Sequence, residues 1–231
     1  MKKISILLFA LMATTFASAQ FDVSVLGSLP TGDFADDAGR DDDGFAKFGF
    51  GASAGYFIET GVEGLGIYPS VSFIYNSSDL ADEISDNLQR QAQQQNIQTT
   101  FDGEGGNYIT IPVTIGPSYK GEVGDGFYVY GTGHIGIGLN VASTLEVSAS
   151  TQNFEYSQEI ETNSPVSFAG GIEGGVILND MWKFGFQFLS LGEPEFEFDQ
   201  SVTQNGQTQT GNSEGELPRA MFLIKLGIVI Q

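Results

Sequence analysis

The chain has 231 residues, enough for one ordinary domain, and it contains 31 glycines, 19 phenylalanines and no cysteine. The lack of cysteine excludes disulfide bonds and thiolate metal sites. The formal net charge of −20 makes nucleic acid a poor partner, because binding to phosphate needs clustered lysine and arginine.

The first segment of the chain, residues 1–19, predicts a secretory signal peptide. Lys2 and Lys3 form a positive start, an apolar run follows, and Ala17-Ser18-Ala19 matches the small-residue cleavage pattern. The apolar run is too short for a transmembrane helix, and no other segment reaches the length that such a helix needs. We expect export, followed by one domain over residues 20–231.

Eight segments of the exported part have strand-like patterns, and most have at least the ~10 residues that a tilted strand needs to cross a membrane. The connections between them alternate between short turns and long stretches, which is the layout of an up-and-down outer-membrane barrel. We therefore predict an all-β fold: an antiparallel, eight-stranded transmembrane barrel with short periplasmic turns and long extracellular loops. The predicted strands are residues 20–29, 46–58, 65–76, 107–120, 127–143, 165–178, 182–191 and 219–231.

The two faces of these strands differ in composition, as residues 126–141, GFYVYGTGHIGIGLNV, illustrate. One face is aliphatic, and the other carries Gly, Thr and Tyr rather than the Lys and Glu of a wet surface. Small and large side chains of this kind suit a narrow enclosed interior. We expect lipid on the aliphatic face; the alternative is a secreted soluble barrel or sandwich with its faces reversed. When apolar residues alone assign the faces, five charged residues fall on the polar face: Asp22, Lys47, Lys120, Glu173 and Lys183.

The long connections hold 22 of the 29 acidic residues. Within them, residues 78–96 predict a short amphipathic helix, since Leu80, Ile84 and Leu88 recur every four positions. Three alternating segments predict strands that project beyond the membrane, and residues 201–215 have the composition of a mobile loop. The projecting segments are residues 144–150, 153–161 and 193–200.

Inward-facing polar residues are the candidates for chemistry. His134 is the only histidine, and Glu173 lies inward on the next strand, so a catalytic dyad is one interpretation. We favour an interior polar network with no catalytic residue, in which Glu173 pairs with Lys225 or His134 and Gln187 lies at a similar height. Four inward tyrosines should help to fill the lumen and prevent an open pore. They are Tyr68, Tyr108, Tyr128 and Tyr130.

No cofactor or metal site is predicted. Residues 32–44 contain six aspartates, but a Ca²⁺ loop needs carboxylates at alternating positions and a late bidentate glutamate, which this stretch lacks. The glycine runs GTGHIGIG and GGIEGG lie within predicted strands and lack the following helix and the Lys-Ser/Thr pair of a phosphate-binding loop.

Several of these stretches together resemble the small eight-stranded outer-membrane β-barrel family of Gram-negative bacteria, the OmpX-like and PorT-like barrels. The resemblance spans essentially the whole exported part. The chain departs from the family at Gln231, where such barrels commonly end in an aromatic residue. The similar pieces are ASAQ (17–20), SLPTGDF (28–34), YITIPVTIGPSY (108–119), GFYVYGTGHIGIGL (126–139) and SFAGGIEGGVIL (167–178).

The resemblance implies insertion into the outer membrane, an extracellular crown of loops and no enzymatic activity. The expected partners are outer-membrane lipid and lipopolysaccharide, the barrel-assembly machinery during biogenesis, and a surface or secretion-system protein. We expect a structural or surface-interaction role through the acidic loops. The alternatives are a narrow channel for small or hydrophobic solutes and a secreted soluble ligand-binding barrel.

Overall fold

The structure, a computed structural model, describes residues 19–35, 44–95, 97–151 and 154–230. The predicted signal peptide up to residue 18 and the aspartates of residues 36–43 lie outside the described residues. Among the described residues, no helix is both long enough and apolar enough to cross a membrane.

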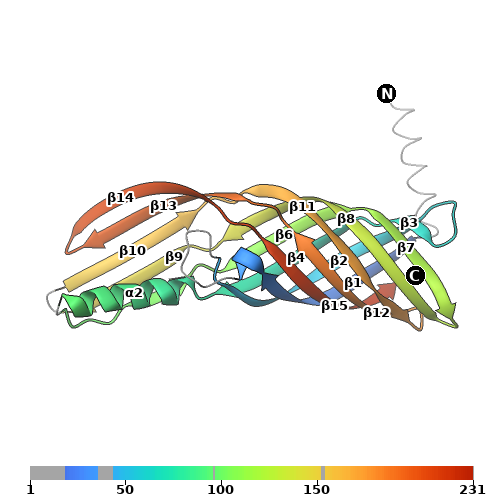
Figure 1. The fold of residues 1–231 in the computed structure, drawn as a ribbon, viewed down its shortest axis with the longest axis horizontal. Helices are drawn as coiled ribbons and strands as arrows, with labels where there is room; N and C mark the ends of the chain where they lie inside the picture. The colour runs from blue at the N-terminus through green and yellow to red at the C-terminus, as the bar shows by residue number, and fades with distance from the viewer. Residues whose placement is uncertain (1–18, 36–43, 96, 152–153, 231) are drawn as a thin grey trace, which may run out of the picture.

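The chain closes into an antiparallel barrel with eight positions around its wall (Figure 1). The order is β1-β15-β12-β11-β8-β6-β4-β2, and pairing of β1 with β2 closes the ring. Breaks at residues 68–69 and at residue 116 interrupt two strands of the wall. On the short-turn side of these breaks, β3 continues the place of β4 and β7 continues the place of β6, and β3 and β7 pair with each other. The strand bounds are β1 Ala19–Thr31, β2 Ala46–Glu59, β3 Leu65–Ile67, β4 Ser70–Ser78, β6 Tyr108–Ile115, β7 Pro117–Gly124, β8 Phe127–Ala142, β11 Val166–Leu178, β12 Trp182–Ser190 and β15 Ala220–Ile230.

These strands confirm the predicted eight-stranded barrel and its alternation of short turns and long connections. The bounds differ from the predicted segments by a few residues. The largest difference is at the turn predicted over residues 121–126, where β7 continues to Gly124 and leaves a tighter connection to β8.

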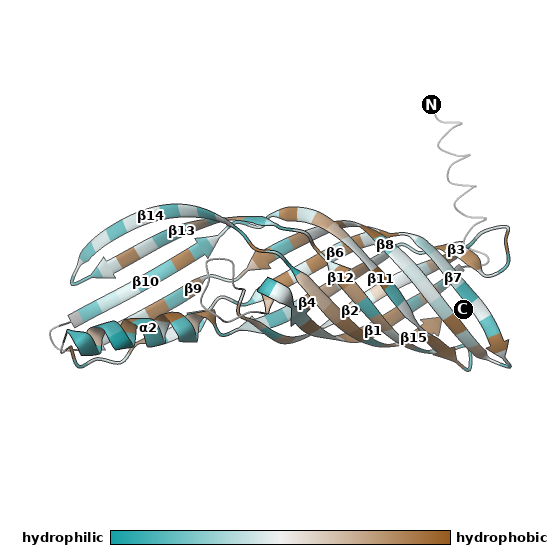
Figure 2. Ribbon diagram, viewed as in Figure 1, coloured by the Kyte–Doolittle hydropathy of each residue, from teal (hydrophilic) through white to brown (hydrophobic). Residues whose placement is uncertain are grey.

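The barrel turns its apolar side chains outward, since many large hydrophobic residues of its strands are exposed. Figure 2 shows brown, hydrophobic segments along the strands of the barrel. Ile172 and Phe186 are each 69% exposed in the middle of their strands. Asp22, Glu173 and Lys183 are buried on the inner side, so the predicted assignment of the faces is confirmed. Lys47 and Lys120 lie near the barrel ends and are half-buried.

Beyond the long-loop end of the barrel, a second sheet and a helix project along the long axis of the molecule (Figure 1). The sheet has the order β14-β13-β10-β9-β5. The predicted helix and projecting strands are confirmed. Their bounds are α2 Leu80–Gln94, β5 Asp102–Gly105, β9 Leu145–Thr151, β10 Phe154–Thr162, β13 Glu195–Gln204 and β14 Gln207–Glu216; a short 3-10 turn, η2 Gly32–Phe34, lies in the first long connection.

The prediction of a mobile loop over residues 201–215 is wrong. These residues complete β13 and form most of β14, joined by a two-residue turn at Asn205 and Gly206. Both turn residues have positive φ, 50° and 80°, as the mirror-image turn of a tight hairpin requires. The Asn-Gly pair is a strong hairpin signal. The segments on either side of it are polar and lack the apolar alternation that usually marks a strand, which is why the hairpin was not predicted.

The helix and the projecting sheet share a small core. The apolar side of α2, with Ala81, Leu88 and Ala92, packs on the inner face of β9, where Leu145 and Val147 are buried. The turn before the helix is held by Leu80 N, which donates to Ser78 Oγ at 3.1 Å. Burial of these side chains keeps the sheet and helix together outside the barrel.

The barrel interior is apolar near the long-loop end, which the sequence did not predict. Phe34 of η2 descends into this end and packs edge-on against Tyr108 at 5.2 Å between ring centroids. Met221 and Leu223 of β15 belong to this cluster. Both faces of β15 are apolar, so its sequence pattern does not show which residues point inward. The cluster comprises Leu26, Phe34, Ala46, Ile74, Tyr108, Ala169, Leu189, Leu191, Met221 and Leu223.

Candidate functional site

Glu173 on β11 is the centre of an ion-pair network inside the barrel. Its Oε2 lies 2.7 Å from Lys225 Nζ on β15 and 3.3 Å from His134 Nε2 on β8. The lysine donates a hydrogen bond to the carboxylate, whereas the imidazole nitrogen is near it without hydrogen-bonding alignment. The structure thus brings three of the four predicted network residues together. Gln187, opposite Glu173 on β12, is also buried, but its Oε1 has no partner among the described residues.

A second carboxylate joins this network, and the sequence did not link it to the first. Lys183 Nζ lies 3.1 Å from Asp22 Oδ1 and 3.4 Å from Glu173 Oε1. Tyr68 donates to Asp22 Oδ2 at 2.7 Å, and Tyr130 donates to Glu173 Oε1 at 2.9 Å. Two carboxylates therefore balance two ammonium groups, which is what a buried ionic cluster needs to be tolerated.

The four predicted lumen tyrosines occupy different levels. Tyr68 and Tyr130 flank Lys183, whose Nζ is 4.6 and 4.7 Å from their ring centroids. Tyr108 lies in the apolar cluster at the long-loop end. Tyr128 is only half-buried, and its ring lies 4.7 Å from Lys120 Nζ.

Inward glycines make room for these rings. A Cβ added at Gly55 would collide with the Tyr68 hydroxyl, and one added at Gly185 would collide with the Tyr130 hydroxyl. Alternation of glycine with large side chains therefore fills the narrow interior, as expected for a barrel of this size.

The barrel has little free space. The cavity beside Asp22, Tyr68 and Lys183 measures about 30 Å³, room for about one water molecule. Among the described residues, the network and the apolar cluster thus fill the interior at two successive levels.

A hydroxyl, an imidazole and a carboxylate lie in line within this network. Thr114 Oγ1 is 3.1 Å from His134 Nδ1, and His134 Nε2 is 3.3 Å from Glu173 Oε2. This order of groups is the one used for nucleophilic catalysis. The His134 and Glu173 side chains are fully buried, Thr114 is also buried, and the carboxylate is bound to Lys225.

Arg219, just before β15, is enclosed by aromatic rings. Its guanidinium carbon lies 5.0, 4.5 and 4.8 Å from the ring centroids of Phe34, Tyr108 and Phe196. Nη1 donates long hydrogen bonds to Thr110 and Asn140, at 3.4 and 3.3 Å. No carboxylate among the described residues pairs with it, so cation–π contacts contribute much of its stabilisation. The three rings come from distant segments of the chain, so the pattern of a single strand does not identify them as partners of Arg219.

The charged side chains on the outer face of the projecting sheet are all acidic, and they lie among serine, threonine and asparagine residues. Directly opposite residues share a face, and the pairs include Glu104 with Glu146, Glu146 with Glu159, and Glu197 with Glu214. Like charges placed opposite one another repel. The five strands contain no lysine or arginine, and all their carboxylates lie on this one exposed face: Asp102, Glu104, Glu146, Glu155, Glu159, Glu161, Glu195, Glu197, Asp199, Glu214 and Glu216.

The alternation of acidic and aromatic residues in EFEFD, residues 195–199, was the signal that could have revealed this face. No group of three or more histidine or acidic side chains in the part of the chain that the structure describes is placed to hold a metal ion. The predicted aspartate loop lies mainly outside that part, at residues 36–43.

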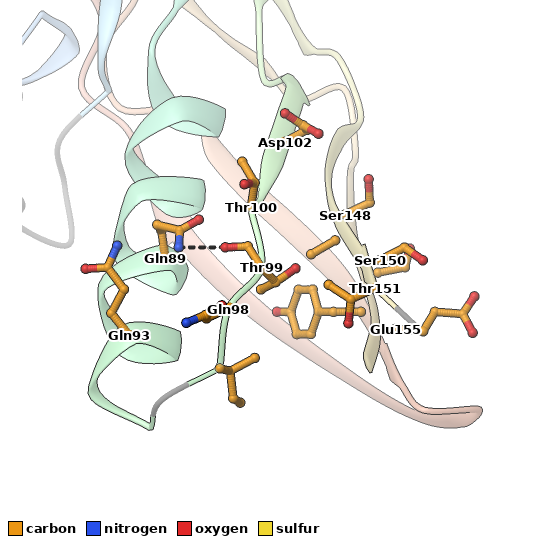
Figure 3. A pocket seen from close by; sticks show the side chains of 14 residues that line it. Gln89, Gln93, Gln98, Thr99, Thr100, Asp102, Ser148, Ser150, Thr151 and Glu155 are labelled. Carbon is orange, nitrogen blue, oxygen red and sulfur yellow. Dashed lines mark hydrogen bonds between the residues drawn. The ribbon is translucent and has the colours of Figure 1, made fainter. Parts of the chain in front are cut away.

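A groove of about 1020 Å³ lies between α2 and strands β9 and β10 (Figure 3). Gln89 on the helix donates from Nε2 to the Thr99 carbonyl at 2.7 Å, and Phe101 N donates back to Gln89 Oε1 at 3.3 Å. Tyr156 lines the groove and donates to Gln158 Oε1 at 2.6 Å. Burial raises the pKa of Tyr156, so its hydroxyl stays protonated and able to donate.

No protein-family model and no curated protein matches this chain. Among solved structures, it is similar to Neisserial surface protein A at 9% identity and a TM-score of 0.45, covering 92% of this chain and 96% of that one. It is similar to OprG from Pseudomonas aeruginosa at 11% identity and a TM-score of 0.45, with coverage of 92% and 96%. It is similar to a major outer membrane protein from Thermus thermophilus at 11% identity and a TM-score of 0.49, with coverage of 92% and 98%. At such low identity these are similarities of fold alone.

Proposed function

We propose that this chain is an integral outer-membrane protein without enzymatic activity, with a closed barrel as its anchor and an acidic projecting sheet as its contact surface. The observation that carries the proposal is the placement of apolar and charged residues. Ile172 and Phe186 are 69% exposed, whereas the neighbouring Glu173 and Gln187 are buried. A continuous apolar exterior of this kind needs a bilayer, because a soluble barrel would expose it to water.

The long-loop end faces the outside of the cell in this proposal. Outer-membrane barrels have short periplasmic turns and long extracellular loops, and the chain starts with the pattern of an export signal. The OmpX-like or PorT-like character is part of the proposal and depends on the sequence resemblance.

Membrane extraction combined with protease treatment tests the proposal. We expect the protein to stay in the envelope until detergent is added, and to migrate differently on gels before and after boiling. On intact cells, protease should cut the projecting unit while the barrel is protected. Recovery in the soluble periplasm without detergent would instead favour the secreted soluble barrel.

The closed lumen leads to an expected result in planar bilayers. We expect no steady unit conductance, because the ionic network around Glu173 and the apolar cluster around Phe34 fill the barrel at two levels. An open porin reconstituted in the same lipid is the positive control. Reproducible unit steps from the purified protein would favour the channel alternative.

The acidic face is suited to a cationic surface of a protein partner, since attraction would relieve the repulsion between opposed carboxylates. Lipid, lipopolysaccharide and the assembly machinery are the proposed partners of the barrel itself. For the acidic face, the probe is a lysine-rich peptide titrated at low and high ionic strength. We expect binding that weakens as salt rises.

Charge-neutralised variants separate this surface from net charge. Replacing Glu146, Glu159, Glu197 and Glu214 by glutamine should remove most of the peptide binding and stabilise the projecting sheet. The matched control changes four carboxylates elsewhere to their amides, at Glu59, Glu63, Asp82 and Asp86. Equal loss of binding in both variants would show that net charge alone, not this face, attracts the probe.

A further inference from the structure

The predicted cleavage of the signal peptide leaves a glutamine as the first residue of the exported chain. The small-residue pattern Ala17-Ser18-Ala19 places the cut before Gln20, which is the second residue of β1. This cleavage rests on the export that is part of the proposed function. A glutamine at a free N-terminus can react with itself, because its α-amine and its side-chain amide are held close together and their union closes a five-membered ring.

Gln20 lies at the short-turn rim of the barrel, at the end of its strand. Its neighbour on β2 is Phe57, whereas the ladder between β1 and β15 begins at Phe21 among the described residues. Gln20 is half-buried and lies beside the small cavity that Asp22 and Lys183 line. The first residue of the exported chain is therefore held against the barrel wall.

Lys120 on β7 binds the side chain of Gln20. Its Nζ donates a hydrogen bond to Gln20 Oε1 at 2.8 Å. The ammonium group is also placed over two rings, 4.7 Å from the ring centroid of Tyr128 and 5.8 Å from that of Phe57. A positive charge fixed at the amide oxygen stabilises the negative charge that develops there when a nucleophile attacks the amide carbon.

We propose that Gln20 cyclises to pyroglutamate once the signal peptide is removed, and that Lys120 polarises the amide for this step. The neutral α-amine, an appreciable fraction at physiological pH because its ordinary pKa is about 8, attacks Cδ. The N–Cδ bond forms and the Cδ–Nε2 bond breaks. The proton that the amine loses passes to Nε2, which leaves as ammonia, so no co-reactant is needed. Cyclisation also removes an α-ammonium group from the neighbourhood of the Lys120 ammonium, where like charges repel.

Mass spectrometry of the N-terminal peptide tests the modification on protein extracted from envelopes with detergent. We expect a chain that begins at residue 20, is lighter than the unmodified sequence by one ammonia and resists aminopeptidase. A chain that begins at residue 20 with an open glutamine would overturn the proposal, and so would a chain that begins elsewhere. Either result, in a protein that leaves the envelope only with detergent, leaves the proposed function intact.

A purified chain separates the role of Lys120 from that of any cellular cyclase. The exported form is prepared behind a removable leader whose cleavage exposes Gln20 at a known time, and the release of ammonia is followed in vesicles. We expect Lys120→Met to slow the reaction about tenfold, the value of one lost hydrogen bond, and Lys120→Arg to retain most of the rate. Lys47→Met, at the opposite end of the barrel, is the matched control and should react as the parent does.

The parent chain unfolded in urea gives a comparison without any substitution. Unfolding separates Lys120 from Gln20, so we expect a loss of rate similar to that of Lys120→Met. Gel mobility before and after boiling shows which variants are folded, and only folded barrels are compared with the folded parent. Equal rates in the folded and the unfolded parent, or an unchanged rate in folded Lys120→Met, would contradict the role of the lysine.

Discussion

Glu173→Gln is expected to lower the free energy of unfolding by about 3–5 kcal/mol, the usual effect of removing one partner of a buried ion pair. The carboxylate is fully buried and accepts from Lys225 at 2.7 Å, with Lys183 at 3.4 Å. The variant keeps the shape of the side chain but leaves buried positive charge without its counter-ion. Urea unfolding in lipid vesicles, followed by the fluorescence of the single tryptophan, Trp182, measures the effect.

A second substitution separates loss of the pair from loss of packing. Glu173→Gln combined with Lys225→Met removes both charges and should recover much of the stability, since an apolar replacement of a buried pair is often neutral. Glu155→Gln, on the exposed acidic face and opposite Ser150, makes the same chemical change in water and should leave the unfolding curve unchanged. A Glu173→Gln barrel as stable as the parent would show that Lys225 does not depend on this carboxylate.

Ile172→Arg is expected to destabilise the barrel in a bilayer by about 2–4 kcal/mol, the cost of an arginine at the membrane midplane. Ile172 is 69% exposed near the centre of β11 and points away from the lumen. In a water-soluble barrel the same change would place a charge in solvent and would be harmless. The free energy of unfolding in vesicles therefore distinguishes hydrocarbon from water around this side chain.

Val123→Arg is the matched control for this experiment. Val123 is 64% exposed but lies near the end of β7, at the short-turn rim. The cost of arginine falls to about 0–1 kcal/mol near the membrane interface. We expect a clear difference between the two variants. Equal effects, or a gain in detergent-free solubility for Ile172→Arg, would place the aliphatic face in water.

Alternation along single strands explains why so much of the barrel could be predicted. A strand shows successive side chains to opposite sides, so the pattern around His134 already separates an outer from an inner face. The lengths of the connections then separate the two ends of the barrel. Both signals are local in sequence, and neither requires knowledge of which strands are neighbours.

The contacts of the interior depend on register, which is a property of the closed barrel. Asp22 and Lys183 are 161 residues apart in sequence, yet their side chains are 3.1 Å apart because β1 and β12 both flank β15. Arg219 likewise meets Phe34, Tyr108 and Phe196 only after three distant segments converge. Single-strand patterns carry no information on such pairings.

The number of barrel strands, the two faces of each strand, the amphipathic helix and the acidic character of the long connections all follow from local periodicity and composition, so they could be predicted without a structure. The folded chain was needed to see that Lys225 and Lys183 share Glu173, that the acidic side chains of five strands line one face, and that α2 packs against β9. These contacts depend on the hydrogen-bond register between strands and on the packing of α2 on the sheet, which are set by residues far apart in sequence. A periodic pattern says which way a side chain points, but not which side chain it meets.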